Sequence, residues 1–536
     1  MKTARIAYAT NVTSDLLPLV KAARELREQH GDSFEIHLRT TEDLMTGEEF
    51  ERFCGLAVQC DLVILVLMGG KDGFPQVETL AAKLAGAGVA LHAQPTATEF
   101  DIDLVKASTV SELQYRQISR YVNYGGRHNL QNLLLYVANE LCGGDFEAKE
   151  PEPPAWDGLY HPDWEHLPSL DEYLADGCLP DRPMVGIVFY QSFWQSESTE
   201  FVDALIREIE KQGSNVLCVF LHTVADVDLG TKGPAWSLEK YFLKDGQPVI
   251  DALISLLAFS LTMRPSSEKG EVNPEESFLK LGVPILKMMV TYNSFEEWRD
   301  GFQGLSMWEI TSSVAMPEFD GMLITVPVAA KQSSETDPLT GARLLRYEPI
   351  PERVGKAVRL ACNWARLRHI PNSDKRVAII LHNNPPRNDN IGGAFGLDTP
   401  VSVWNLLRDM QAAGYTLEAL PESGQMVIDS IIERCTNDRR WANMEDLARR
   451  AIDKIRAEDY RHRFSELPED MQSRMRAQWG EPPGRVFAHG EELLVPGILN
   501  GNIFIGLQLP RGFMEDPEAI YHSPDLPIPY HYHAYY

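Results

Sequence analysis

The hydrophobic pattern of the chain alternates between short apolar runs and longer segments with apolar residues at helical spacing. In residues 1–148 the runs 5–10, 34–39, 62–68 and 89–92 are typical of buried strands, and amphipathic segments separate them. Strands that alternate with helices predict a parallel sheet with helices on both faces. We therefore expect an α/β domain of the open, Rossmann-like type at the start of the chain.

The same alternation returns twice, after a stretch of different composition. Residues 149–183 are rich in proline and in tryptophan and tyrosine, which predicts an ordered crossover between domains. A second α/β domain is expected over 184–345, with strands at 184–190, 216–221, 283–290 and 322–328. A third is expected over 346–536, with strands at 377–381, 486–487 and 503–505 and a helical insertion at 429–480. The fold class is thus multidomain α/β.

The most informative stretch follows the apolar strand predicted at 377–381. It is a loop rich in proline and glycine, and Thr399-Pro400 is a typical helix start after it. The loop holds an imidazole, two amides and a guanidinium, from His382, Asn383, Asn384 and Arg387. Open α/β sheets bind ligands at the carboxyl ends of their strands. These four residues are therefore the first candidates for substrate binding.

A second polar loop occupies the same kind of position. Residues 191–196 follow the strand predicted at 184–190, and they combine amides and hydroxyls with Phe193 and Trp194. One interpretation is a surface for a large flat ligand, since aromatic and polar groups together line such pockets. The other is a hydrophobic plug formed by Phe193 and Trp194 between domains. The sequence leaves both open.

Composition and charge exclude several classes of protein. The formal net charge of -27 argues against nucleic-acid binding and against anionic membrane surfaces; it predicts either simple solubility or an acidic face for a basic partner. The apolar runs are shorter than the ~20 residues of a membrane helix. The seven cysteines are scattered without CxxC spacing, which disfavours a disulfide framework or a thiolate metal site. We expect a cytoplasmic protein.

Two blocks of sequence resemble a known family. Residues 382–402, HNNPPRNDNIGGAFGLDTPVS, resemble the HNYPP…IGNAVGLDTPxS signature of the cobaltochelatase large subunit (CobN) family, which is related to the magnesium-chelatase H subunit. Residues 501–536 are similar to the family segment QPPRGFxxDPxxxYHSPDLPPPHHYLAFY. Both blocks are long and specific, and the resemblance extends over nearly the whole chain.

The resemblance implies further site residues. Gln508 and Arg511 match the family segment QPPRG, which makes them candidates for substrate binding; a salt bridge from Arg511 to Asp516 is the structural alternative. His531 matches a histidine of the segment PHHY and is the candidate metal ligand. His531 and His533 would face one side if this segment were extended. The alternative is that a histidine pair among tyrosines is incidental.

The implied function is that of the tetrapyrrole-binding large subunit of an ATP-dependent cobaltochelatase. Such an enzyme inserts Co2+ into hydrogenobyrinic acid a,c-diamide in cobalamin biosynthesis, and AAA+ ATPase and adaptor subunits hydrolyse the ATP. This chain has no Walker motif, in agreement with that division of labour. The alternatives are a Mg2+ or Ni2+ chelatase subunit and a non-catalytic tetrapyrrole carrier or scaffold.

The family continues into a segment like HxGTHGTxEWLPGK, which carries the residues usually assigned to chemistry. No such segment occurs in this sequence. We therefore expect an amino-terminal piece, a split subunit or a relative without the catalytic half. The catalytic residues are unknown, and the chain alone is expected to be inactive.

Overall fold

The computed structural model of the chain describes residues 2–96, 100–262, 274–509 and 526–536. These form two compact units, Met1–His369 and Ile370–Tyr536. Mixed α/β structure with parallel sheets flanked by helices confirms the expected fold class. None of the described helices combines the length and apolarity needed to cross a bilayer. The division into segments at 148, 183 and 345 stays a prediction.

The first lobe of unit 1 is a four-stranded parallel sheet, as the alternation predicts. Its strands lie in the order β2-β1-β3-β4. The strands are β1 (Ala4–Thr10), β2 (Phe34–Thr40), β3 (Leu62–Leu67) and β4 (Ala90–Pro95), and the helices are α1 (Leu16–His30), α2 (Gly47–Ala57), α3 (Val77–Ala87), α4 (Ile102–Ala107), α5 (Glu112–Tyr124) and α6 (Gly126–Cys142).

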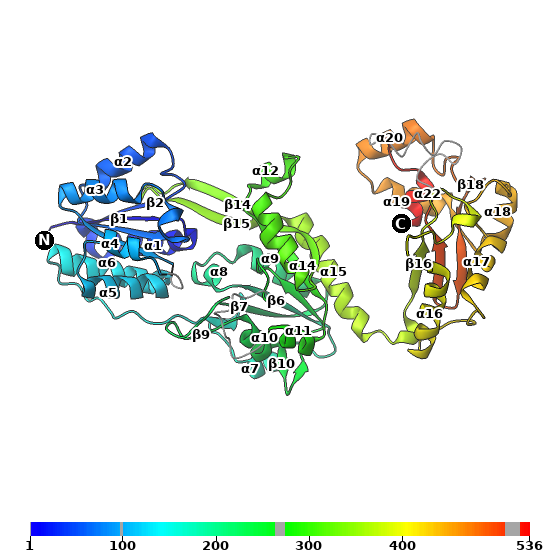
Figure 1. Cartoon of the computed structure of the whole chain (residues 1–536), viewed down its shortest axis with the longest axis horizontal. Helices are drawn as coiled ribbons and strands as arrows, with labels where there is room; N and C mark the ends of the chain where they lie inside the picture. Colours follow the sequence, from blue (N-terminus) through cyan, green and yellow to red (C-terminus); the bar gives the residue numbers. More distant parts are fainter. Residues whose placement is uncertain (1, 97–99, 263–273, 510–525) are drawn as a thin grey trace. The chain divides into compact units, whose positions relative to one another are not determined.

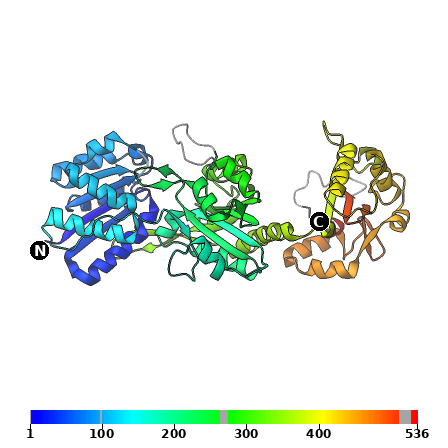
Figure 2. The same cartoon turned by 90° about the horizontal axis from the view of Figure 1, so that it is seen from below.

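Helices cover both faces of this sheet (Figures 1 and 2). Successive residues of β1 point to opposite faces, so Ile6 and Tyr8 pack against α1 and α6 while Ala7 and Ala9 pack against α2 and α3. Because both faces are buried, the central strands β1 and β3 are apolar at nearly every position, whereas the edge strand β2 alternates apolar and polar residues. This explains why the central strands were recognisable in the sequence as continuous apolar runs.

The second lobe is a seven-stranded sheet in the order β15-β14-β13-β12-β6-β7-β5. Its strands are β5 (Asp157–Leu159), β6 (Met184–Tyr190), β7 (Asn215–Leu221), β12 (Ala252–Ser255), β13 (Ile285–Thr291), β14 (Leu323–Thr336) and β15 (Arg343–Pro349). Its helices are α7 (Leu170–Asp176), α8 (Gln191–Gln195), α9 (Glu200–Lys211), α10 (Pro234–Phe242), α11 (Pro274–Leu281), α12 (Phe295–Asp300), α13 (Met307–Glu309), α14 (Met316–Phe319) and α15 (Pro351–His369).

The five central strands of this sheet are parallel, and the two edge strands, β5 and β15, run antiparallel to them. β12 is not among the strands that the sequence pattern predicts. β15 and α15 also belong to unit 1, and α15 packs on this sheet through Val354, Val358 and Ala361.

A hairpin arm joins the two lobes of unit 1. β14 continues to Thr336, beyond the predicted end at residue 328, and its outer half pairs only with β15. The arm reaches the edge strand β2 (Figure 1), where the Leu38 amide donates to the Thr340 oxygen at 3.0 Å. Leu344, with Ala342, is buried in the core of the first lobe. The arm therefore completes that core from the second lobe.

Unit 2 contains two small sheets of three strands each. One has the order β16-β21-β20 and the other β17-β19-β18. The strands are β16 (Val377–Leu381), β17 (Asp453–Arg456), β18 (Ala488–His489), β19 (Glu492–Val495), β20 (Gly497–Asn500) and β21 (Ile503–Leu507), and the helices are α16 (Thr399–Ala412), α17 (Gly424–Glu433), α18 (Met444–Arg450), α19 (Ala457–Ser465), α20 (Glu469–Trp479) and α22 (Tyr530–Tyr535).

Two details of unit 2 differ from the sequence-based expectation. The insertion predicted as purely helical also contains β17, which pairs antiparallel with β19. Val486 and Phe487 lie outside the strands; Phe487 is buried with a positive φ of 51° and precedes β18. Single apolar pairs carry too little periodicity to separate a short strand from a buried turn.

Candidate functional site

His382 and Gln508 emerge side by side from two adjacent parallel strands of unit 2. β16 and β21 are paired in register, with Leu381 opposite Leu507. The Gln508 amide continues the ladder by donating to the Leu381 oxygen at 2.8 Å. The two sequence blocks that resemble one family, more than a hundred residues apart in the chain, therefore meet at the carboxyl edge of one sheet, where α/β proteins place ligand sites.

The loop after β16 is held in shape by its own polar groups. Asn383 is completely buried, and its Oδ1 accepts a hydrogen bond from the Arg387 amide at 3.3 Å. The Gly392 amide donates to the His382 oxygen at 2.7 Å. His382 and Arg387 are exposed, and Asn384 is half-buried. Asn383 therefore has a structural role in positioning the loop, while His382, Asn384 and Arg387 present their side chains to solvent.

A buried polar turn that the sequence analysis missed connects the loop to Gln508. Thr436, Asn437 and Asp438 follow α17 and are all buried. Asn437 accepts from Asn383 Nδ2 at 2.6 Å and donates from its own Nδ2 to the Gln508 oxygen at 2.7 Å. The sequence contains a signal for this turn, namely a run of short polar residues after an apolar helix. The run falls within the helical insertion predicted at 429–480, which hides it.

Arg387 belongs to a network of charges at the rim of the loop. Its guanidinium pairs with Asp389, which also accepts from Arg440 at 3.2 Å. Arg440 in turn forms a forked pair with the buried Asp438, at 2.9 and 2.6 Å. The hydrogen bond from Arg387 keeps the pKa of Asp389 far below its ordinary value. Burial raises the pKa of Asp438, but the hydrogen bonds from Arg440 and the Asn388 amide outweigh it, so both carboxyl groups remain ionised.

The carboxyl-terminal candidates have different outcomes. Arg511 lies outside the described residues. His531 and His533 lie on helix α22, about 200° apart around its axis, so the expected extended segment with both imidazoles on one side is wrong. His533 Nδ1 lies 2.9 Å from the Tyr460 hydroxyl. Helix formation at a chain end depends on packing, here of Tyr530 in the core beside Tyr460, which an HxH spacing does not reveal.

His531 itself is deeply buried. Its side chain is 2% exposed, and neither ring nitrogen has a hydrogen-bond partner among the described residues. Burial lowers the pKa of His531 to about 4, so the ring is neutral at pH 7, the state in which imidazole binds metals. Across the described ranges no three His, Cys, Asp or Glu side chains converge as a metal site would require.

Comparison with known proteins identifies the family. The sequence profile of the CobN/Magnesium Chelatase family matches residues 119–536. The chain belongs to this family. It is 28% identical, over 98% of its length, to the aerobic cobaltochelatase subunit CobN of Pseudomonas aeruginosa, and 35% identical over 99% to an uncharacterized protein of Methanocaldococcus jannaschii. The catalytic subunit of cobaltochelatase from Mycobacterium tuberculosis superposes with a TM-score of 0.66, at 25% identity and over 99% of this chain.

This CobN/magnesium chelatase chain covers only part of those relatives. It spans 40% of the Pseudomonas sequence, 43% of the Methanocaldococcus sequence and 41% of the solved structure. The resemblance that the two sequence blocks indicated is thus confirmed at the level of the family. The roles of the individual residues in unit 2 stay predictions, because none of the comparisons assigns a function to them.

The contacts of the polar loop 191–196 of this family member bear on the two interpretations that the sequence left open. Trp194 stacks on Phe220, with ring centroids 4.3 Å apart and planes 6° apart, and Phe193 packs edge-on against Phe201 and Tyr347. The aromatic residues therefore pack on the core of their own lobe, and these contacts do not form the expected plug between domains. Gln191 and Gln195 line a cavity of about 300 Å³ within unit 1.

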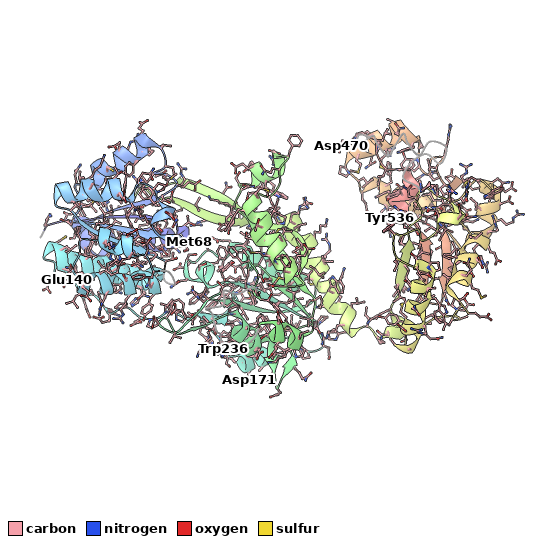
Figure 3. The ribbon with its side chains drawn as sticks, viewed as in Figure 1. Met68, Glu140, Asp171, Trp236, Asp470 and Tyr536 are labelled. Atoms are coloured by element: carbon pink, nitrogen blue, oxygen red, sulfur yellow. The ribbon has the colours of Figure 1, made fainter. Side chains whose placement is uncertain are left out.

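That cavity lies between the carboxyl edges of the two parallel sheets of unit 1. From the first lobe it is lined by Asp15, Met68 and Asn123, and from the second by Trp156, Gln191 and His222, among others. Met68 lies at the end of β3 on the side of the first lobe toward the second (Figure 3). We call this cavity the interlobe crevice. Strand-end loops of the two successive sheets of unit 1 thus face one hollow.

Proposed function

We propose that this chain supplies tetrapyrrole-binding surface to the large subunit of an ATP-dependent cobaltochelatase acting in cobalamin biosynthesis. The substrates would be hydrogenobyrinic acid a,c-diamide and Co2+, and ATP would be hydrolysed by AAA+ partner subunits. The observation that carries the proposal is that the loop bearing His382 and Arg387 and the residue Gln508 follow two adjacent parallel strands and are linked through the buried Asn383–Asn437 pair. It is supported by membership of the CobN/magnesium chelatase family.

The geometry of the loop suits a macrocycle with carboxylate side chains. Arg387 and Arg440 share the exposed carboxylate of Asp389, so an incoming substrate carboxylate can take its place between two guanidinium groups. His382 is exposed on the same loop as Arg387, and imidazole is the side chain most often used for proton transfer, which the reaction needs because two pyrrole protons leave when a metal enters the ring. The buried Asn383–Asn437 pair keeps this rim fixed, which limits the loss of conformational entropy on binding.

An absorbance titration tests the proposal. Hydrogenobyrinic acid a,c-diamide added to the chain should shift its visible absorption saturably, with a Kd in the micromolar range or below, about -8 kcal/mol or stronger. His382→Ala and Arg387→Ala should each raise the Kd about tenfold or more, since each removes a charged or polar contact. Arg408→Ala is the matched control, because Arg408 is an exposed arginine of α16 that pairs with its neighbour Asp409. Absence of a shift, or equal effects of all three variants, would contradict the proposal.

The family name also covers magnesium chelatases, so a magnesium chelatase is the second candidate. The two are separated by competition. With the partner ATPase subunits and a polypeptide carrying the HxGTHGTxEWLPGK-like segment of the large subunit present, Co2+, Mg2+ and Ni2+ are offered together with the free macrocycle, and the inserted metal is identified by mass spectrometry. Cobalt insertion is the outcome we expect. Preferential insertion of Mg2+ or Ni2+ would assign the chain to the other branch, and binding without insertion of any metal would support a carrier.

A further inference from the structure

The interlobe crevice of unit 1 has the architecture of a ligand site that the proposed function does not use. In the first lobe β1 has β2 on one side and β3 on the other, so the direction in which strands are added to the sheet reverses between β1 and β3. In the second lobe β6 likewise has β7 on one side and β12 on the other. Open α/β sheets bind ligands outside the carboxyl ends of the strands at such a point. Here the loops after β1, β3 and β4 face those after β6 and β7 across the crevice.

The first-lobe side of the crevice is a rigid frame. Asn11 bridges β1 and β3: its Nδ2 donates to the Met68 oxygen at 2.9 Å, and its Oδ1 accepts from the Met68 amide at 2.7 Å. Thr10 adds a hydrogen bond from its hydroxyl to the Val66 oxygen at 2.8 Å. A preorganised frame of this kind holds the lining groups in place before a ligand arrives.

Asp15 is the only charged side chain on the described lining. The Tyr8 hydroxyl donates to its Oδ2 at 2.8 Å, and the described residues supply no donor to Oδ1. One carboxylate oxygen is therefore free to accept hydrogen bonds from a ligand. Asn123 lies nearby with its Oδ1 occupied by Gln94 Nε2 at 2.7 Å, which orients the Asn123 amide group.

The second-lobe side supplies amides and a ring. Gln191 is 4% exposed and donates to Gln195 Oε1 at 3.1 Å, and Gln195 donates to the Tyr124 oxygen at 2.5 Å. Trp156 packs edge-on against His222, with centroids 5.4 Å apart. Burial lowers the pKa of His222, so that ring is neutral at pH 7. The wall thus combines fixed amide groups with flat apolar surface.

Charge and size decide the class of ligand. Neither lysine nor arginine occurs on the described lining, and Asp15 repels anions, which excludes phosphate esters and carboxylated macrocycles. A volume of about 300 Å³ lies at the lower end of small-molecule pockets. A carboxylate oxygen pairs well with neighbouring hydroxyl groups, as in the ribose contact of dinucleotide-binding folds.

We propose that the interlobe crevice binds a small uncharged ring bearing adjacent hydroxyl groups, a free sugar or a nucleoside, with Asp15 accepting hydrogen bonds from two of its hydroxyls. The inference does not rest on the proposed chelatase function, since it uses no residue of unit 2. A ligand here would contact both lobes, so its binding would favour one arrangement of the lobes over others.

The test uses the full chain and four neutral probes: D-ribose, D-glucose, adenosine and uridine. Saturation-transfer NMR and calorimetry should show saturable binding of at least one of these probes. Comparison of the two sugars with the two nucleosides then tells which of the two classes the crevice binds. ADP, the anionic counterpart of adenosine, should bind about tenfold more weakly or not at all. Failure of all four probes, or ADP binding as tightly as the best neutral probe, would overturn the proposal.

Three variants locate the binding. Asp15→Asn should weaken the best probe about tenfold or more, since it replaces a charged acceptor with a neutral one. Met68→Trp should block the crevice, and because Met68 is 57% exposed, the larger side chain leaves the buried core intact. Asp203→Asn is the matched control, because Asp203 also accepts from a tyrosine hydroxyl, Tyr160, at 2.7 Å, but away from the crevice. Unchanged affinity in Asp15→Asn and Met68→Trp would also overturn the proposal.

Discussion

The side chains of Asn383 and Asn437 meet in a completely buried hydrogen bond of 2.6 Å, between residues that are 54 positions apart. Through this pair, and the bond from Asn437 to the Gln508 oxygen, three separate segments of unit 2 are fixed to one another. A buried amide pair of this kind is stable only while every donor and acceptor is satisfied. The pair therefore holds the candidate site in one geometry.

Replacement of Asn437 should destabilise unit 2. Asn437→Ala leaves the buried Asn383 amide and the half-buried Gln508 oxygen without these partners, at a total cost of about 2–4 kcal/mol. Urea denaturation followed by circular dichroism measures the loss. Asn390→Ala is the control, because Asn390 donates to the Pro385 oxygen in an exposed bond of 3.2 Å. Equal stability of the two variants would mean that the buried pair does not hold the loop.

Asp15 should destabilise the protein at neutral pH, as buried binding groups commonly do. Burial raises the pKa of Asp15 to about 6, above its ordinary value of 3.8, so folding favours the protonated form. The free energy of unfolding therefore falls as the pH rises from about 4 to 6, because Asp15 ionises more readily in the unfolded state. Above that range it stays at the lower value. Asp15→Asn should raise the free energy of unfolding by about 1–3 kcal/mol at pH 7.

The same comparison at pH 4 should show little difference between Asp15→Asn and the wild type. At pH 7 the other titratable groups on the crevice are neutral, because burial raises the pKa of Tyr190 and lowers that of His222. A variant that is less stable than the wild type at pH 7 would show that Asp15 is needed for folding and is not a destabilising site residue.

Lys287 gives a second pH-dependent prediction. It lies on β13, is 1% exposed, and donates to the Met288 oxygen at 2.8 Å. Burial lowers the pKa of Lys287 to about 7 from 10.5, so the folded state disfavours its charge, and stability should rise as the pH increases from 7 to 10.5. Lys287→Met should stabilise the protein by about 2–4 kcal/mol at pH 7 and by less than about 1 kcal/mol at pH 10. A stability difference between Lys287→Met and the wild type that does not change with pH would contradict the inference that burial disfavours the charged form of Lys287.

His531→Phe separates packing from metal binding. Without metal, the exchange removes two buried nitrogens that have no partner among the described residues, so the melting temperature should stay equal or rise. If His531 is a ligand, the affinity for Co2+ measured by calorimetry should fall about tenfold or more. His489→Ala, at an exposed histidine of β18, is the control. Unchanged Co2+ affinity would remove His531 from the candidate ligands.

Local patterns predicted much of this structure, and the residues show why. Strand β3 is apolar at every position and Leu381 ends another apolar run, so both strands could be recognised from the sequence, and the rule that ligand sites follow the carboxyl ends of strands pointed to the loop of His382. Asn437 was missed because its position depends on how a chain segment folds back over β16 and β21, which no periodicity records.

The other misses have the same physical origin. The extension of β14 beyond residue 328 is stabilised by β15 and by a lobe some three hundred residues earlier in the chain, for example through the bond from Arg39 to Thr340, 301 positions away. The helix at His531 is stabilised by packing of Tyr530. Tertiary contacts decided these elements, and the local sequence alone was compatible with either outcome.

The hairpin arm has a consequence for biosynthesis. Arg39 and Thr340 are 301 positions apart, and translation at roughly 5–20 residues per second separates their synthesis by about 15–60 s. During that interval the open edge of β2 and the gap that Leu344 later fills are exposed on the ribosome, where an unpaired strand edge invites association with other nascent chains. Chaperone capture of this intermediate should therefore be strongest before the arm is synthesised.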